Sequence, residues 1–280
     1  DQVLTAANTL ADEDVLGTIS YQWNRAGTAI SSATSGTYTL TQSDVGSAIT
    51  VTASYTDGQN TAESETSAAT SAVANVNDDP TGSVTISGTA TEDQVLTAAN
   101  TLADEDVLGT ISYQWNRAGT AISSATSTTY TLVQADVGSA ITVTASYTDA
   151  QGSAESSTSA ATSAVANVND DATASISGTA TEDETLTASA ADEDGVTSAS
   201  YTYVWNRAGT AISGATSSTY ILTQDDVGSA ITVTISFSDD LGGTETPTSS
   251  ATSAVANVND DPSGSVTVTG TAQEDEVLGI

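Results

Sequence analysis

Apolar and small polar residues alternate along most of this chain, and Gly, Asp or Asn interrupts the alternation at short intervals. Such a period of two, rich in β-branched and aromatic residues, is typical of strands with one buried face. No stretch keeps a helical period. In the middle third of the chain the pattern predicts strands at 83–87, 94–99, 111–117, 129–133, 140–147 and 162–168.

The pattern is an internal repeat. Trp23, Trp115 and Trp205 are 92 and 90 residues apart, and each lies in the sequence WNRAG. Residues 1–80 and 93–172 are nearly identical, whereas the third copy is more divergent. Several short strands in about 90 residues are typical of a β-sandwich. We therefore predict an immunoglobulin-like repeat lacking its first strand at 1–79, complete repeats at 80–171 and 172–261, and the first strand of a truncated fourth repeat at 262–280.

Two features narrow the sandwich to an immunoglobulin topology. Trp115 falls on the third strand, where immunoglobulin domains bury a tryptophan, and Asp136 begins a corner before the next long strand. Leu96 and Val143 stand where the usual disulfide cysteines would be, so aliphatic packing replaces the sulfur bridge. The predicted fold class is all-β, with tandem immunoglobulin-like (cadherin-like) β-sandwiches in an elongated array.

Composition excludes several functions. The chain has no Cys, His, Met or Lys, and three arginines stand against 36 acidic residues, for a net charge of −33. Such a polyanion does not bind nucleic acid, and we expect no direct contact with anionic membranes. A serine nucleophile would lack a His, Lys or Cys partner. Carboxylate pairs can hydrolyse glycosides, but nothing marks a cleft, so we predict that the protein is not an enzyme.

The segments YQWNRAGTAISSATSTTYTLVQADVGSAITVTASYTD (113–149) and VANVNDDP (73–80) resemble the tandem immunoglobulin-like extender repeats of giant bacterial RTX-type adhesins, which are type I-secreted. The resemblance covers essentially the whole chain, although similar units occur in many secreted bacterial proteins. It implies an extracellular or cell-surface location and a structural stalk stiffened by interdomain calcium. That stalk would project a distal binding domain for adhesion or biofilm formation.

The acidic residues fall at the two ends of each predicted sandwich. In an immunoglobulin topology the BC and FG loops lie at the end where the chain enters, and the AB and EF loops at the end where it exits. Carboxylate and carbonyl oxygens suit calcium, which takes six to eight of them. Alternate residues of an extended stretch point the same way, so an Asp-x-Asp pair can face one ion.

Calcium between neighbouring repeats is therefore predicted, as in cadherins by analogy. The candidate ligands are the acids of these loops and of the recurring linker NVNDD: Asp78, Asp79, Glu92, Asp93, Asp104, Asp106, Asp149, Asn169, Asp170, Asp171, Glu182, Asp183, Asp192, Asp194, Asp239 and Asp260, with Asp136 as a further candidate.

Other interpretations stay open at this stage. The acids could be solvated loop caps, because Asp and Asn form turns without any metal. The chain could be a carbohydrate- or ligand-binding array, which predicts exposed aromatics, or an accessory region of a secreted enzyme. The tryptophans could stack on sugars or lie in the core. Each arginine could bind an anionic ligand or pair with the corner aspartate of its own repeat.

The partners expected are calcium and the neighbouring repeats of the same chain. A further partner is a second copy. Repeat 1 lacks its first strand and has an open sheet edge, while residues 264–270 form a first strand without a body. We therefore expect head-to-tail strand exchange between molecules of this polypeptide.

Overall fold

The computed structural model describes residues 2–197, 199–275 and 277. Asp1 of repeat 1, and Glu276 and residues 278–280 of the truncated fourth repeat, lie outside the described residues. The chain divides into two units, Asp1–Ala166 and Asn167–Ile280. Among the described residues, no helix is long and apolar enough to cross a membrane.

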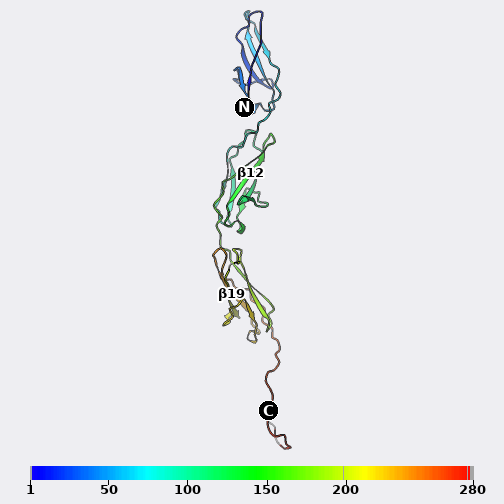
Figure 1. The fold of residues 1–280 in the computed structure, drawn as a ribbon, viewed down its shortest axis with the longest axis vertical. Coiled ribbons are helices and arrows are strands. Elements are labelled where there is room, and N and C mark those ends of the chain that lie inside the picture. The colour runs from blue at the N-terminus through cyan, green and yellow to red at the C-terminus, as the bar shows by residue number, and fades with distance from the viewer. Residues whose placement is uncertain (1, 198, 276, 278–280) are drawn as a thin grey trace. The chain divides into compact units, whose positions relative to one another are not determined.

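The first unit, coloured from blue to green in Figure 1, contains residues of two repeats. Each of these repeats has two antiparallel sheets. Repeat 1 has a two-stranded sheet, β1-β4, and a four-stranded sheet in the order β3-β2-β5-β6. Their strands are β1 (Val3–Thr5), β2 (Ser20–Arg25), β3 (Thr28–Ala29), β4 (Thr37–Thr39), β5 (Ile49–Thr56) and β6 (Ala62–Thr66).

Repeat 2 has a three-stranded sheet, β11-β8-β7, and a four-stranded sheet in the order β10-β9-β12-β13. Its strands are β7 (Val84–Ser87), β8 (Val95–Asn100), β9 (Ser112–Arg117), β10 (Thr120–Ala121), β11 (Thr129–Thr131), β12 (Ile141–Thr148) and β13 (Ala154–Thr158).

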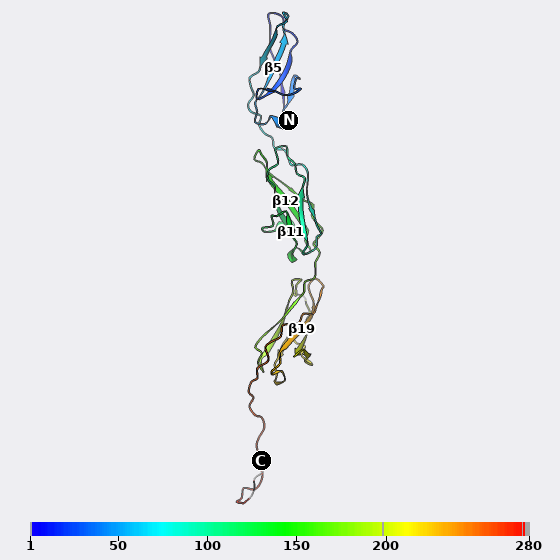
Figure 2. The ribbon, with the colours of Figure 1, turned by 180° about the vertical axis from the view of Figure 1, so that it is seen from behind.

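The second unit repeats this arrangement with the sheets β14-β15-β18 and β17-β16-β19-β20. Its strands are β14 (Thr173–Ser177), β15 (Thr185–Ala191), β16 (Thr202–Arg207), β17 (Thr210–Ala211), β18 (Thr219–Ile221), β19 (Ile231–Ser238) and β20 (Thr244–Glu245). A short 3-10 helix precedes the long strand of each four-stranded sheet: η1 (Gln42–Asp44), η2 (Gln134–Asp136) and η3 (Gln224–Asp226). Those long strands, β5, β12 and β19, are labelled in Figure 2. The predicted tandem immunoglobulin-like fold is confirmed, while the exact repeat boundaries stay a prediction.

Alternation in the sequence accounts for the cores. Along β12 the residues Ile141, Val143, Ala145 and Tyr147 are buried, and the residues between them are less so. Trp23, Trp115 and Trp205 are 3%, 0% and 0% exposed, which confirms the core interpretation of the tryptophans and contradicts their use as sugar platforms. Leu96 and Val143 are fully buried in one core cluster, as expected for replacements of a disulfide.

One predicted strand was misplaced. The last edge strand of repeat 2 is β13 (Ala154–Thr158), whereas 162–168 makes only isolated bridges, such as Val137 with Val165. The sequence AESST has no apolar alternation because both of its faces are largely solvated at the sheet edge. Its pairing with β12 is made by the backbone, so the pattern of side chains carries no signal for it.

The corner aspartates bind the arginines of their own repeats, as predicted. Arg117 Nε lies 2.7 Å from Asp136 Oδ1, and the same distance separates the counterparts in the other two repeats. Each corner carboxylate also accepts a hydrogen bond from a tyrosine hydroxyl, for example Tyr130 at 2.9 Å. Asp136 is therefore a buried structural group, and both of its carboxylate oxygens already have protein partners.

In repeat 1 one edge of strand β1 has no partner strand among the described residues, and apolar side chains nearby are partly exposed. Within the described residues β1 pairs with β4 alone, whereas β8 lies between β11 and β7. Leu4 and Leu40 are partly exposed, although their counterparts in repeat 2 are fully buried. Val266 and Val268, in the segment equivalent to β7, are 89% and 64% exposed.

We predict that residues 264–270 of one molecule add to β1 of another, because an unpaired edge is a template for a matching strand. Sedimentation velocity should then show a weight-average sedimentation coefficient that rises with protein concentration. Replacing Val266 and Val268 by aspartate should leave a monomer. A wild-type chain that sediments as a monomer at every concentration would contradict the prediction.

Candidate functional site

The end of repeat 3 at which the chain enters gathers three acidic segments, and we call it the entry pole of repeat 3. It is formed by the linker 169–172, the loop residues 192–195, and residues 239–245 around the β19–β20 turn. Asp192, Asp239 and Glu245 each offer a carboxylate oxygen within 4.8 Å of the other two. Asp239 is 6% exposed, Glu245 is 7% exposed and Asp192 is partly buried.

Backbone hydrogen bonds hold these carboxylates in place. Asp239 Oδ1 accepts from the Leu241 and Gly243 N–H groups at 2.7 and 3.0 Å, and Asp192 Oδ1 accepts from the Asp194 N–H at 2.9 Å. The second oxygens, Oδ2 of Asp192 and of Asp239, are buried without a hydrogen-bond partner. Each carboxylate is thus fixed through one oxygen while the other is bare.

The electrostatic effect of bringing these carboxylates together is clearest in the pKa of Asp192. Burial raises the pKa of this carboxyl, and the neighbouring charges of Glu245, Asp194 and Asp239 raise it further, against the lowering effect of the Asp194 N–H bond. Crowded carboxylates disfavour one another's ionised forms unless a positive charge compensates them.

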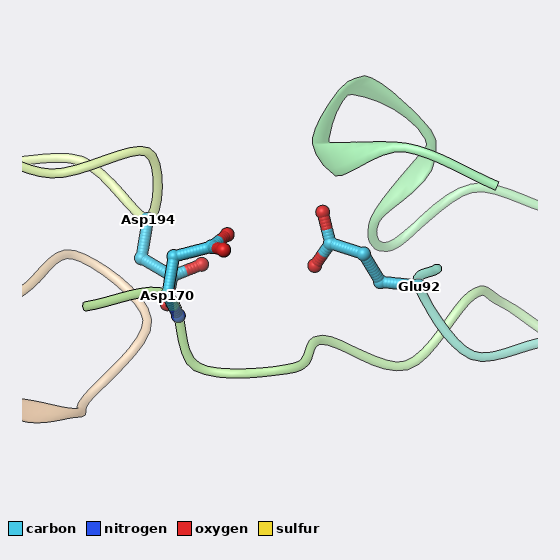
Figure 3. A group of neighbouring side chains, drawn as sticks. All are labelled: Glu92, Asp170 and Asp194. Atoms are coloured by element: carbon cyan, nitrogen blue, oxygen red, sulfur yellow. The ribbon is translucent and has the colours of Figure 1, made fainter. Parts of the chain in front are cut away.

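Hydrogen bonds join the linker to the other two segments of this pole. The Asn169 side chain donates to Glu245 Oε1 at 2.9 Å, and the Ala172 N–H donates to Oε2 at 3.1 Å. The Asp170 N–H donates to Asp194 Oδ2 at 3.0 Å. Figure 3 shows the side chain of Asp170 beside that of buried Asp194, with a carboxylate oxygen of each within 4.8 Å of the other. Linker and pole therefore form one acidic surface.

The entry pole of repeat 2, in the first unit, is formed by the linker 77–80, residues 104–107 and residues 149–155. The Asp78 N–H donates to buried Asp106 at 3.0 Å, and the Gln42 side chain donates to the other oxygen of that carboxylate. The bond from Asp78 lowers the pKa of Asp106, against desolvation and with help from Asn75 and Gln42.

Other contacts of this second pole differ from those of repeat 3. Asn77 donates to Glu155 at 2.8 Å, and Asp149 Oδ2 is buried without a partner. The counterparts of the repeat 3 trio are Asp104, Asp149 and Glu155. Within the part of the chain that the structure describes, these three are not gathered within 4.8 Å.

The exit ends of the sandwiches place the remaining candidates. Glu92 and Glu182 are buried, and Glu182 accepts a hydrogen bond from the Val258 N–H at 3.1 Å. Asp93 and Asp183 are exposed turn residues with φ of 61° and 67°. Three linker acids are also exposed: Asp79, Asp171 and Asp260.

The sequence supplies no cation for the trio. Each of the three arginines binds a corner aspartate, and there is no lysine or histidine. Among the described residues, no salt bridge involves Asp192, Asp239 or Glu245. Burying a carboxylate without a compensating charge lowers the free energy of unfolding.

The donor set fits a hard cation. An added Cβ on Gly243 would lie 1.8 Å from Asn169 Oδ1 and 2.2 Å from Asp239 Oδ2, so an amide oxygen joins the carboxylates where Gly243 leaves room. Oxygen ligands without nitrogen or sulfur, mixing carboxylates with an amide, are what calcium takes.

Glu245 and Glu155 are the pole residues that the sequence analysis missed. A signal was present, because a glutamate follows the acid of the same turn at a constant spacing in all three repeats: Asp57 and Glu63, Asp149 and Glu155, Asp239 and Glu245. The glutamates lie in or beside the edge strand that the alternation failed to locate, so they could not be placed at the pole.

Two comparisons find nothing: no protein-family model matches the chain, and no curated protein matches it. Solved structures do match. A tetra-tandem repeat in the extending region of a large adhesion protein has 20% identity and a TM-score of 0.30, over 86% of this chain and 68% of that chain.

Two further matches are adhesins. A Ca²⁺-stabilized adhesin that helps an Antarctic bacterium bind ice has 15% identity and a TM-score of 0.29, over 98% of this chain and 72% of that chain. A 1.5-MDa bacterial ice-binding adhesin has 14% identity and a TM-score of 0.26, over 88% and 89% of the two chains. Repeats of large bacterial adhesins are thus among the solved structures that this chain is similar to over most of its length.

Proposed function

We propose that this chain is a structural extender of a large bacterial adhesin, at the cell surface or secreted, and that calcium at the entry poles stiffens it. The observation that carries the proposal is the trio of buried Asp239, buried Glu245 and partly buried Asp192, two of whose carboxylates each leave one oxygen without a partner. The sequence resemblance to extender repeats supports the same role. Near-identical neighbours suit a spacer, because its length follows from the number of copies.

The ion would act by joining the linker to the sandwich. Asn169 belongs to the linker, whereas the trio belongs to the loops and edge strand of repeat 3. One calcium ion held by both would restrict the linker. Without calcium, the carboxylates would repel one another and the linker would gain freedom. Calcium modules of extracellular proteins bind at about 10⁻⁴–10⁻³ M, so millimolar calcium would add roughly 1–2 kcal/mol per site.

A spacer also agrees better with the aromatic residues than a sugar-binding array does. Stacking platforms must be exposed, but each tryptophan is buried and its indole N–H is bound within its own repeat; Trp115 donates to the Ser127 carbonyl at 2.8 Å. The distal binding domain that such a stalk would project, and its role in adhesion or biofilm formation, belong to this proposal.

Calcium should raise the unfolding temperature of the chain and straighten it. A gain of 1 kcal/mol raises the midpoint of a domain of this size by about 4–8 °C. We expect calorimetry to show this rise at millimolar calcium, with little effect of magnesium, which demands a tighter octahedral site. Small-angle scattering should show a larger maximum dimension with calcium than with chelator.

A pair of matched variants tests the site. Asp239→Asn removes a buried pole charge, and Asp225→Asn removes an exposed charge on η3. The first should lose part of the calcium-dependent rise, whereas the second should keep it. The proposal would be contradicted if both variants kept the same calcium-dependent rise in unfolding temperature. It would also be contradicted if chelator left the maximum dimension of the chain unchanged.

A further inference from the structure

One aromatic position distinguishes the three entry poles. It holds Tyr55 in repeat 1, Tyr147 in repeat 2 and Phe237 in repeat 3. The Tyr55 hydroxyl donates to Asp12 Oδ2 at 2.9 Å, and the Tyr147 hydroxyl donates to Asp104 Oδ2 at 2.5 Å. The tyrosine therefore caps the first aspartate of the Asp-x-Asp pair in repeats 1 and 2.

Repeat 3 has no such cap. Phe237 carries no hydroxyl, and the equivalent oxygen, Asp192 Oδ2, is buried without a hydrogen-bond partner. Burial without a partner is costly for a carboxylate. The ring of Phe237 itself stays in the core at 4% exposure, so the exchange changes the polar contact and keeps the packing.

A second difference lies at the β19–β20 turn. Gly243 replaces Ser153, and any side chain there would meet Asn169 Oδ1 and Asp239 Oδ2. The glycine thus lets the linker amide oxygen approach the carboxylate. Asp239 is 94% buried, since its exposure is 6%, and its bare Oδ2 points toward the same space.

A third difference lies in the linker. Ala172 replaces Pro80, and its N–H donates to Glu245 Oε2. Proline has no N–H, so the linker of repeat 2 cannot make this bond to Glu155. Repeat 3 consequently draws its linker onto the glutamate through two hydrogen bonds, from Asn169 and Ala172.

We infer that the entry pole of repeat 3 binds calcium more tightly than the entry pole of repeat 2, and that Phe237 in place of Tyr147 sets this order. The inference rests on the proposed function. In repeat 2 the Tyr147 hydroxyl donates a hydrogen bond to Asp104 and so stabilises the calcium-free pole. Calcium binding there is therefore less favourable in free energy. In repeat 3 the Oδ2 atom of Asp192 has no hydroxyl partner, and only the cation would satisfy it. The chain therefore has a graded response: on falling calcium, the linker of repeat 2 is released before that of repeat 3.

The test exchanges the two residues in the full chain, as Phe237→Tyr and Tyr147→Phe. A hydrogen bond to a charged group is worth enough to change affinity about tenfold. We expect Phe237→Tyr to weaken calcium binding at repeat 3 by about this factor and to raise the melting temperature of the calcium-free chain. Tyr147→Phe should tighten binding at repeat 2 and lower the calcium-free melting temperature.

The readout must separate the poles. The Gly243 and Ser153 N–H groups donate to Asp239 and Asp149, so their amide NMR signals report calcium at repeat 3 and repeat 2 respectively. Tyr113→Phe is the matched control, because it removes a hydroxyl that accepts a hydrogen bond from the amide of Asn100 and not from an acid of the pole. It should leave both titrations unchanged.

The outcomes are distinct. If the wild-type chain does not respond to calcium, the proposed function fails and this inference fails with it. If the chain binds calcium but repeat 2 saturates first, or both exchanges leave the affinities unchanged, the inference alone is overturned. Because the two exchanges have opposite expected effects, misfolding of one variant still leaves a decisive result from the other.

Discussion

Replacing Arg207 by methionine is expected to destabilise repeat 3 by about 3–5 kcal/mol at neutral pH, because it leaves a buried carboxylate without its cation. Asp226 is 0% exposed, and Arg207 Nε lies 2.7 Å from its Oδ1. The other oxygen accepts hydrogen bonds from Tyr220 at 2.9 Å and from the Thr223 N–H at 2.8 Å. These neutral donors cannot replace the guanidinium charge.

The loss should depend on pH. Burial tends to raise the pKa of Asp226, but the bonds from Arg207, the Thr223 N–H, Tyr220 and the Thr223 hydroxyl outweigh it and lower the pKa below its usual value. A carboxyl with a lowered folded-state pKa contributes stability above its unfolded value of about 3.9, and that stability is lost as pH falls through the folded pKa. Without Arg207 the first of these lowering bonds is lost, so Asp226 should take up a proton at higher pH than in the wild type.

The difference between the wild type and Arg207→Met should therefore be largest near neutral pH and shrink in acid. Urea unfolding followed at several pH values between about 3 and 7 measures it. Asp225→Asn, which removes the exposed neighbouring charge, is the control and should change stability little. A loss that is the same at every pH would show that Arg207 acts through packing of its aliphatic stem and not through charge.

The corner was predictable because its partners repeat in the sequence. Arg117 and Asp136 recur in register in all three copies, and the chain contains no other cation. The strands of the core were predictable for a related reason: a half-buried strand such as β12 must alternate, and the alternation is visible in Ile141, Val143, Ala145 and Tyr147.

The edge strand and the details of the poles were not predictable in this way. β20 brings Glu245 opposite Phe237, and this register decides which side chains meet at the pole. The role of Gly243 depends on how closely the linker approaches the turn, which no local pattern encodes. The Asp-x-Asp pairs could be recognised as candidates, but the gathering of Asp192 with Asp239 and Glu245 depends on three segments that are distant in the sequence.

Replacing Trp115 by alanine is expected to remove about 3–5 kcal/mol from the stability of repeat 2, because it empties the largest site of a closed core. Trp115 is fully buried, its ring stacks on Tyr130 with centroids 5.8 Å apart, and its indole N–H donates to the Ser127 carbonyl. In a tandem array each repeat folds around its own core and couples only to its neighbours. Calorimetry should therefore show one transition shifted strongly downward.

Val133→Thr is the matched control for this variant. Val133 is exposed in repeat 2, and the equivalent residues of the other repeats, Thr41 and Thr223, are already threonine. This substitution should change the free energy of unfolding of repeat 2 by no more than about 0.5 kcal/mol, as is usual for surface substitutions. The pair therefore tests whether the buried tryptophan stabilises the core of repeat 2, because only Trp115→Ala removes a side chain from that core.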